Sequence, residues 1–298
     1  MTGRLIYLAS YPKSGNTWLR AMLFAYMHHD QAIDINAIDI APYAADRATI
    51  DRIAGLRLTD LPAADANQMR YAVLDHLGRK QGHRLFFKVH EANLPQTDGS
   101  LSFTAASVHV ALYPIRHPYD VAVSFAHHLG RALDMDTVVS IMCDPDYRMS
   151  RQAAHRFSQI IADWGSNVRS WTMQAGITCM PLRYEDMLLD PATALRQAVV
   201  ACWPETAVDE VALQHAIAQT QFSKLQQQEK VASFSERPTP ATRFFRTGLA
   251  GEGAAILNLA QRDRLWDAHR SVMQSFGYRR DGSIDAAPLH HPIPTCPA

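Results

Sequence analysis

The sequence lacks a net charge and long hydrophobic runs, and each absence excludes a class of protein. Lysine plus arginine and aspartate plus glutamate both number 29 among the 298 residues, so no global field attracts nucleic acid or an acidic membrane. No apolar run approaches the roughly 20 residues that span a bilayer. The four residues before the first apolar run leave no room for a signal peptide. We therefore expect a cytoplasmic protein with neither a nucleic acid nor a membrane as partner.

Cysteine is also scarce. The four cysteines, Cys143, Cys179, Cys202 and Cys296, form no C-x-x-C pair. Such scattered residues favour reduced thiols over a disulfide framework. The 14 histidines include three adjacent pairs, and none of these makes a zinc ligand set with its neighbours. The pairs, His127–His128 among them, are interpreted as surface or core residues, and no metal site is predicted.

What the chain does contain is enough apolar residues, 47% of the total, for one large α/β domain. No internal repeat or boundary divides it, so 1–280 is predicted to be a single domain and 281–298 a loosely ordered tail. Four short apolar runs are predicted as strands: 5–10, 84–90, 108–114 and 177–182. The second is apolar on both faces, which is typical of a parallel sheet covered by helices. The predicted fold is α/β, with a central, mostly parallel sheet flanked by helices.

The segments between these runs divide into helices and loops. Helical spacing of apolar residues predicts helices over 16–28, 65–81, 118–125, 150–174, 191–202, 208–219 and 258–276. Three polar or broken segments are expected near a ligand pocket: 31–64 with short helices, 130–150 irregular and mobile, and 226–242 as a lid.

The first strand runs directly into a turn and then a helix at Tyr-Pro-Lys-Ser-Gly-Asn-Thr-Trp, residues 11–18. The free amides and the positive dipole end of such a helix make an anion site. Lys13 adds a full positive charge. This is not the Walker pattern, because Lys13 precedes Gly15 and there is only one glycine. The predicted guest is a phosphate or a sulfate; the alternative is a plain helix-start turn that carries an exposed lysine.

Two further strand ends carry polar residues. Lys88 and His90 close the second run, and residues two apart in a strand share a face. Arg116, just after the third run, is followed by Pro118, which suits a first helical turn and places Ser124 on the helix. The carboxyl ends of parallel strands are where open α/β sheets bind ligands. The alternative to ligand binding is that His90 is a structural histidine and Lys88 a solvated strand end. For Arg116 the alternative is a surface arginine.

Taken in order, these motifs resemble those of the sulfotransferases that use 3′-phosphoadenosine-5′-phosphosulfate (PAPS). The resemblance runs from about residue 5 to 253 and includes Tyr-Glu-Asp-Met at 184–187, Thr-Gln-Phe at 220–222 and Arg-Thr-Gly at 246–248. Residues 9–18, 167–171 and 183–186 look closest to bacterial sulfotransferases that act on natural products. The resemblance implies the P-loop-like nucleotide-binding fold of that family.

The resemblance also implies a role for each matching residue. The donor PAPS and the product PAP would be bound by Lys13, Ser14, Gly15, Asn16, Thr17, Trp18, Arg116, Ser124, Tyr184, Thr220, Phe222, Arg246, Thr247 and Gly248. His90 would be the catalytic base, Lys13 would stabilise the leaving phosphate, and Lys88 would steady the sulfuryl oxygens, without a metal. Thr247 replaces a lysine of the family pattern, and residues 252–254 replace its Asp-Trp-Lys. The contacts of the lid at these positions are therefore not predicted.

The implied reaction is transfer of a sulfuryl group to a hydroxyl or amine of a small-molecule or natural-product acceptor. A kinase with an atypical phosphate loop is one alternative, although no strand end offers a magnesium-binding acid. A non-catalytic nucleotide-binding protein is another, although the base His90 is present. For Phe222, core packing competes with adenine stacking. The acceptor is not encoded in the loops, and a homodimer is a possible assembly without a motif to support it.

Overall fold

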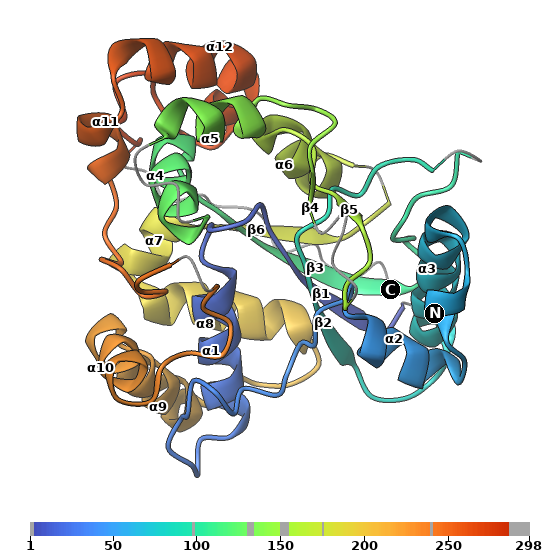
Figure 1. Ribbon diagram of the computed structural model, residues 1–298. Coiled ribbons are helices and arrows are strands. Elements are labelled where there is room, and N and C mark those ends of the chain that lie inside the picture. Colours follow the sequence, from blue (N-terminus) through green and yellow to red (C-terminus); the bar gives the residue numbers. More distant parts are fainter. Residues whose placement is uncertain are drawn as a thin grey trace.

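A four-stranded parallel sheet lies at the centre of the molecule. The computed structural model describes residues 3–96, 99–129, 134–149, 155–174, 176–238 and 241–285. The strands follow the order β2 (Leu85–Val89), β1 (Leu5–Ala9), β3 (Val108–Ile115) and β6 (Cys179–Arg183). Every pairing is parallel, which confirms the predicted α/β sheet (Figure 1). All five residues of β1 are buried, as expected for a strand covered on both faces.

Helices cover both faces of the sheet. Alternate residues of β1 divide between two apolar cores: Tyr7 packs with residues of α3, α4, α6 and α12, whereas Leu8 packs with residues of α1, α8 and α9. Figure 1 shows these two groups on either side of the strands. The bounds are α1 Asn16–Met27, α2 Arg47–Ala54, α3 Ala63–Arg79, α4 Pro118–His128, α6 Trp164–Thr172, α8 Pro191–Cys202, α9 Glu210–Gln219 and α12 Leu259–Ser275.

The remaining elements are short or lie at the edges. They are the 3-10 turn Leu58–Asp60, α5 Met135–Met142, α7 Tyr184–Leu189, α10 Phe222–Ala232, α11 Glu252–Ile256, and an antiparallel pair formed by β4 Arg148–Met149 and β5 Gln159–Ile160. None of the helices in the described part of the chain is long and apolar enough to cross a membrane.

Two sequence predictions were wrong around the centre of the chain. The long helix expected over 150–174 begins only at Trp164, because Asp163 caps it by accepting a hydrogen bond from the Ser166 amide, and Ala162 has a left-handed φ of 60°. Part of the irregular segment expected over 130–150 is the helix α5, whose Val138 and Val139 are buried. Residues 130–133 and 150–154 lie outside the described residues.

The outer segments differ from expectation in smaller ways. The expected lid over 226–242 begins as helix, since α10 extends to Ala232. Of the expected tail, residues 281–285 are described. Asp285 donates its amide to the Gly277 carbonyl at 2.8 Å, and Ile284 forms a bridge with Tyr278. The rest of that tail, 286–298, lies outside the described residues.

A buried ion pair fixes the segment that follows β2. Both terminal nitrogens of Arg70, on α3, donate to the carboxylate of Glu91 at 2.7 Å, and the Tyr71 hydroxyl donates to it at 2.8 Å. Both charged side chains are almost completely buried. Trp171 donates to the Glu91 carbonyl at 2.8 Å. Because Glu91 directly follows His90 in the sequence, these bonds also determine where His90 lies.

Candidate active site

The predicted site residues meet at one cavity of about 470 Å³ beside the carboxyl ends of the strands. Fourteen of the sixteen line it: Lys13, Gly15, Asn16, Thr17, Trp18, Lys88, His90, Arg116, Ser124, Tyr184, Phe222, Arg246, Thr247 and Gly248. Ser14 and Thr220 are buried but are not part of the lining. The hydroxyl of Thr220 donates to the Ala216 carbonyl at 2.7 Å and is therefore used within α9.

The turn between β1 and α1 has an unusual backbone. Lys13 and Gly15 both have left-handed φ angles, 70° and 105°. A Cβ on Gly15 would lie 2.7 Å from the Tyr184 ring, so only glycine fits there. The side-chain amide of Asn16 donates to the Leu8 carbonyl at 2.8 Å and to Ser10 Oγ at 3.2 Å. This side-chain amide therefore holds the turn in shape. The first backbone amides of α1 have no carbonyl one turn earlier in the helix, although that of Trp18 donates to the Gly15 carbonyl at 3.1 Å.

Two buried donors beside this turn have no partner among the described residues. They are the Ser14 hydroxyl and Nε of Arg116. A buried polar group without a partner costs about 1–3 kcal/mol. The other guanidinium nitrogens of Arg116 donate to the carbonyls of Leu249 at 2.8 Å and Lys13 at 3.4 Å. Unsatisfied donors beside a positively charged turn fit an anionic ligand.

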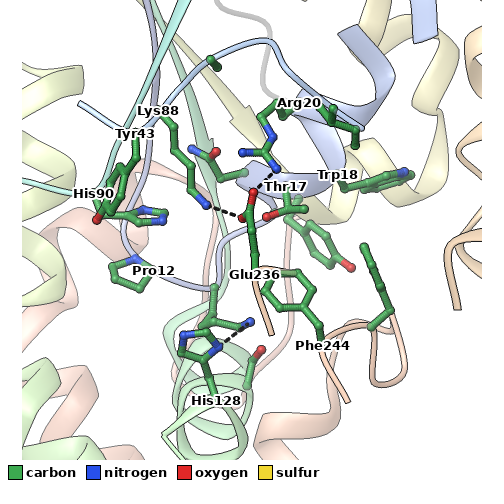
Figure 2. A pocket seen from close by; sticks show the side chains of 18 of the residues that line it. Pro12, Thr17, Trp18, Arg20, Tyr43, Lys88, His90, His128, Glu236 and Phe244 are labelled. Atoms are coloured by element: carbon green, nitrogen blue, oxygen red, sulfur yellow. Dashed lines mark hydrogen bonds and ion pairs between the residues drawn. The ribbon is translucent and has the colours of Figure 1, made fainter. Parts of the chain in front are cut away.

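His90 is held as a neutral base. Its Nδ1 lies 2.9 Å from the Ser10 carbonyl, which can only accept, so Nδ1 carries the proton and Nε2 keeps its lone pair. Burial, together with the nearby charge of Lys88, lowers the pKa of His90 to about 3. Asn167 donates to the His90 carbonyl at 3.0 Å. Figure 2 shows the ring beside Tyr43 and Lys88.

Lys13 contacts His128, one of the paired histidines predicted to be surface or core residues. Nζ of Lys13 lies 3.4 Å from Nδ1 of His128 and 4.1 Å from the centre of the Phe244 ring. Burial, with the charges of Lys88 and Arg116, lowers the pKa of Lys13 to about 7. His128 lines the cavity, four residues after Ser124 on α4. That helical spacing is the signal that could have identified it.

Lys88 is paired with a residue of the expected lid. Its Nζ lies 2.9 Å from the carboxylate of Glu236, which Arg20 of α1 also binds. Figure 2 shows this carboxylate between the two cations. Burial alone would raise the pKa of Glu236, but the charges of Lys88 and Arg20 lower it to about 2. Neither Glu236 nor Arg20 was identified from the sequence.

Aromatic side chains and the first three residues of the closing segment 246–253 also line the cavity. Trp18 donates to the Thr220 carbonyl at 3.0 Å. The ring of Phe222 packs under Gly248, where a Cβ would lie 2.6 Å from the ring. Arg246 and the hydroxyl of Thr247 both bind Glu252, at 2.6 and 2.8 Å. The guanidinium of Arg246 is therefore paired within its own segment.

Asp120 ties that closing segment to α4. Its two carboxylate oxygens accept the amides of Gly251 and Gly253, both at 2.7 Å. A Cβ on Gly253 would lie 2.3 Å from the Tyr119 backbone, so the two segments touch. Asp120 therefore holds the segment that carries Arg246 and Gly248.

No group of three or more histidine, cysteine, aspartate or glutamate side chains in the described ranges is arranged to hold a metal ion.

Comparison with known proteins agrees with this geometry. Flavonol 3-sulfotransferase of Flaveria bidentis is 25% identical over 265 residues, which is 83% of this chain and 74% of that enzyme. A retinol dehydratase solved with androsterone and the inactive cofactor PAP has a TM-score of 0.58 at 17% identity, over 93% of this chain and 82% of that one. Mouse sulfotransferase SULT7A1 complexed with PAP has a TM-score of 0.55 at 16% identity, over 91% and 84% of the two chains. The sulfotransferase domain profile matches residues 4–277, and the chain therefore belongs to the sulfotransferase domain family.

Proposed function

We propose that this sulfotransferase transfers the sulfuryl group of PAPS to a hydroxyl or amine of a small-molecule acceptor. One observation carries the proposal: Lys13, His90 and Arg116, which follow three different strands, line the same cavity, and Ser124 joins them from α4. The two related structures described above were solved with PAP, which supports a bisphosphorylated adenosine as the ligand here.

The donor would lie across the carboxyl edge of the sheet. The amides of the 14–17 turn and the Ser14 hydroxyl would hold the 5′-phosphate. Arg116 and Ser124 would hold the 3′-phosphate, because a guanidinium can donate two parallel hydrogen bonds to phosphate oxygens. Tyr184, Trp18 and Phe222 offer aromatic faces at the same end for the adenine. Thr220 would support Trp18 through its carbonyl.

Transfer would be a direct in-line displacement. The acceptor oxygen or nitrogen attacks the sulfur while the bond from sulfur to the bridging oxygen breaks, and that electron pair stays on the 5′-phosphate of PAP. Nε2 of His90 takes the acceptor proton. Lys13 stabilises the charge that grows on the leaving phosphate. Lys88 binds the sulfuryl oxygens in exchange for Glu236, the carboxylate that it contacts in this structure.

Arg116→Ala tests the donor site. We expect 3′,5′-ADP to raise the melting temperature of the wild-type protein without magnesium, and ATP with magnesium to raise it much less. In the variant, loss of a buried charged hydrogen bond of about 1.5–3 kcal/mol should weaken 3′,5′-ADP binding about 10- to 100-fold. Arg196→Ala, which removes an exposed arginine paired with Glu210, is the control. Stabilisation only by ATP with magnesium would favour a kinase instead, and an unchanged Kd in the variant would contradict the role of Arg116.

Lys13 should make nucleotide binding depend on pH. Its pKa of about 7 means that the free enzyme loses this charge as the pH rises above 7. A bound anion favours the charged form and raises that pKa, so binding takes up a proton and affinity falls by up to about tenfold per pH unit above this value. Calorimetric titration of 3′,5′-ADP between about pH 6 and pH 9 measures the slope. Lys13→Arg keeps the charge and should flatten it; an equal slope in that variant would show that another group is responsible.

The related enzymes and the cavity lining together indicate an acceptor class. The enzymes named above act on or bind a flavonol, retinol and androsterone, all of which are compact and largely apolar. Ile38, Ile40, Met149 and Phe244 line this chain's cavity and suit a similar carbon skeleton. The motifs at 9–18, 167–171 and 183–186 resemble bacterial sulfotransferases that act on natural products, so a natural product is the narrower form of this proposal.

A further inference from the structure

One end of the cavity lies beyond the residues assigned to the donor. We call it the acceptor end and define it by eight side chains of the cavity lining: Ile38, Ile40, Tyr43, Lys88, Met149, Arg156, Glu236 and Phe244. The ring of Tyr43 meets the His90 ring edge-on, with 5.7 Å between the ring centres. Figure 2 shows Tyr43, His90 and Lys88 together at this end. A group that contacts Tyr43 is therefore close to the point of transfer.

Arg156 brings a positive charge to this end. Its guanidinium carbon lies 5.1 Å from the centre of the Tyr43 ring. Lys88 lies 5.7 Å from the centre of the same ring, but its charge is neutralised by Glu236. Within the described ranges, no carboxylate forms an ion pair with Arg156. The two cations of the acceptor end therefore differ: one has a counter-ion in the protein and the other faces the cavity without one.

The backbone of Arg156 is firmly placed. It forms an isolated antiparallel bridge with Asp46, and its carbonyl accepts a hydrogen bond from Nε of Arg47 at 3.2 Å. The next residue, Phe157, is completely buried. Only the guanidinium of Arg156 is therefore available for a ligand, and its position relative to Tyr43 is set by the fold.

Positive side chains outnumber negative ones around the cavity as a whole. Six cations line the cavity, namely Lys13, Arg20, Lys88, Arg116, Arg156 and Arg246, against the two carboxylates of Asp39 and Glu236. Glu252 pairs with Arg246, and Glu236 pairs with Lys88 and Arg20. The phosphates of the donor would balance Lys13 and Arg116. Burial lowers the pKa of both Lys88 and His128, and the charge of Arg156 adds to each shift, so Arg156 acts on the groups around the transfer point. A neutral acceptor that excluded water would leave this guanidinium desolvated and unpaired, which is unfavourable.

We infer that the acceptor carries a carboxylate or a similar anionic group that pairs with Arg156 while its hydroxyl or amine faces His90. This rests on the proposed sulfuryl transfer. A planar guanidinium suits such a group because it can donate two parallel hydrogen bonds to one carboxylate. Arg156 is then the residue that selects among acceptors, and the apolar side chains of the acceptor end provide contact without selecting for charge.

The test uses acceptors that differ only in charge. 3-(4-Hydroxyphenyl)propionate is compared with its carboxamide and with tyramine, and 6-hydroxyhexanoate with its carboxamide, using labelled PAPS. The wild-type enzyme should show a kcat/KM at least about tenfold higher for the carboxylate in each pair, as expected for one charged hydrogen-bonded contact. Arg156→Met should abolish this ratio mainly through a higher KM for the carboxylate. Arg156→Lys should keep part of it, because it retains the charge but not the planar fork.

A matched control is Arg148→Met, which removes an exposed arginine outside the cavity and should keep the full preference. Preference for the carboxamide or tyramine, or a carboxylate preference that survives Arg156→Met, would overturn the inference. So would the absence of transfer to all five compounds by protein that binds 3′,5′-ADP. A protein that does not bind 3′,5′-ADP would instead refute the proposed function, which distinguishes the two failures.

Discussion

Replacement of His90 by alanine is expected to lower kcat by about 10²- to 10⁴-fold, the usual contribution of a general base, with the Kd for 3′,5′-ADP nearly unchanged. The reason lies in the tautomer. The Ser10 carbonyl holds the proton on Nδ1, so Nε2 is the only ring nitrogen that can take a proton from the acceptor. Alanine removes this nitrogen and leaves the anion-binding turn in place.

Single-turnover rates with labelled PAPS and calorimetric binding of 3′,5′-ADP would check this prediction. His76→Ala is the matched control, because His76 is an exposed histidine on α3. A His90→Ala enzyme with near-full turnover would show that another group accepts the proton. A parallel loss of nucleotide affinity would show that the substitution disturbs the donor site.

Breaking the Arg70–Glu91 pair is expected to have the largest effect on stability. Arg70→Met leaves the Glu91 carboxylate buried without its counter-ion, and loss of one partner of a buried pair typically costs about 3–5 kcal/mol of the free energy of unfolding. Urea unfolding would measure the loss. Arg79→Met on the same helix removes an arginine that forms an exposed pair with Asp75, and should leave the unfolding midpoint nearly unchanged.

A double variant separates the charge from the packing. Arg70→Met combined with Glu91→Leu replaces both charges by apolar groups and should recover most of the stability lost in Arg70→Met, since replacing a buried pair by apolar residues is often neutral. If Arg70→Met alone were as stable as the wild type, the pair would contribute nothing to this fold. If the double variant were less stable than either single variant, the cost would come from packing.

The sequence predicted the sheet and most helices because those signals are local. Runs that are apolar on both faces lead to buried parallel strands, and repeats at helical spacing lead to α1, α8 and α12. The helix prediction was wrong for 155–163 because the apolar residues there also fit helical spacing. Only the structure shows that Ala162 has a left-handed φ and that Asp163 caps the start of α6.

The site likewise contains residues that the sequence could predict and residues that it could not. Lys13 and Arg116 follow β1 and β3, and Lys88 lies near the carboxyl end of β2, so the topology of a parallel sheet brings them to one edge. Glu236 and Arg156 come from segments far along the chain, and only the packing of α10 and of the stretch after β4 places them at the cavity. No local pattern marks such residues. Their functional roles, and those of the strand-end residues, stay predictions until the variants are measured.

α4 carries three features of the site at four-residue intervals. Asp120 holds the closing segment, Ser124 faces the expected 3′-phosphate, and His128 touches Lys13. Four residues advance a helix by about 6 Å and return to nearly the same face. One helix therefore sets the spacing between the closing segment, the hydroxyl of Ser124 and the side chain of Lys13. A shift of α4 by even a fraction of a turn would move Asp120, Ser124 and His128 together.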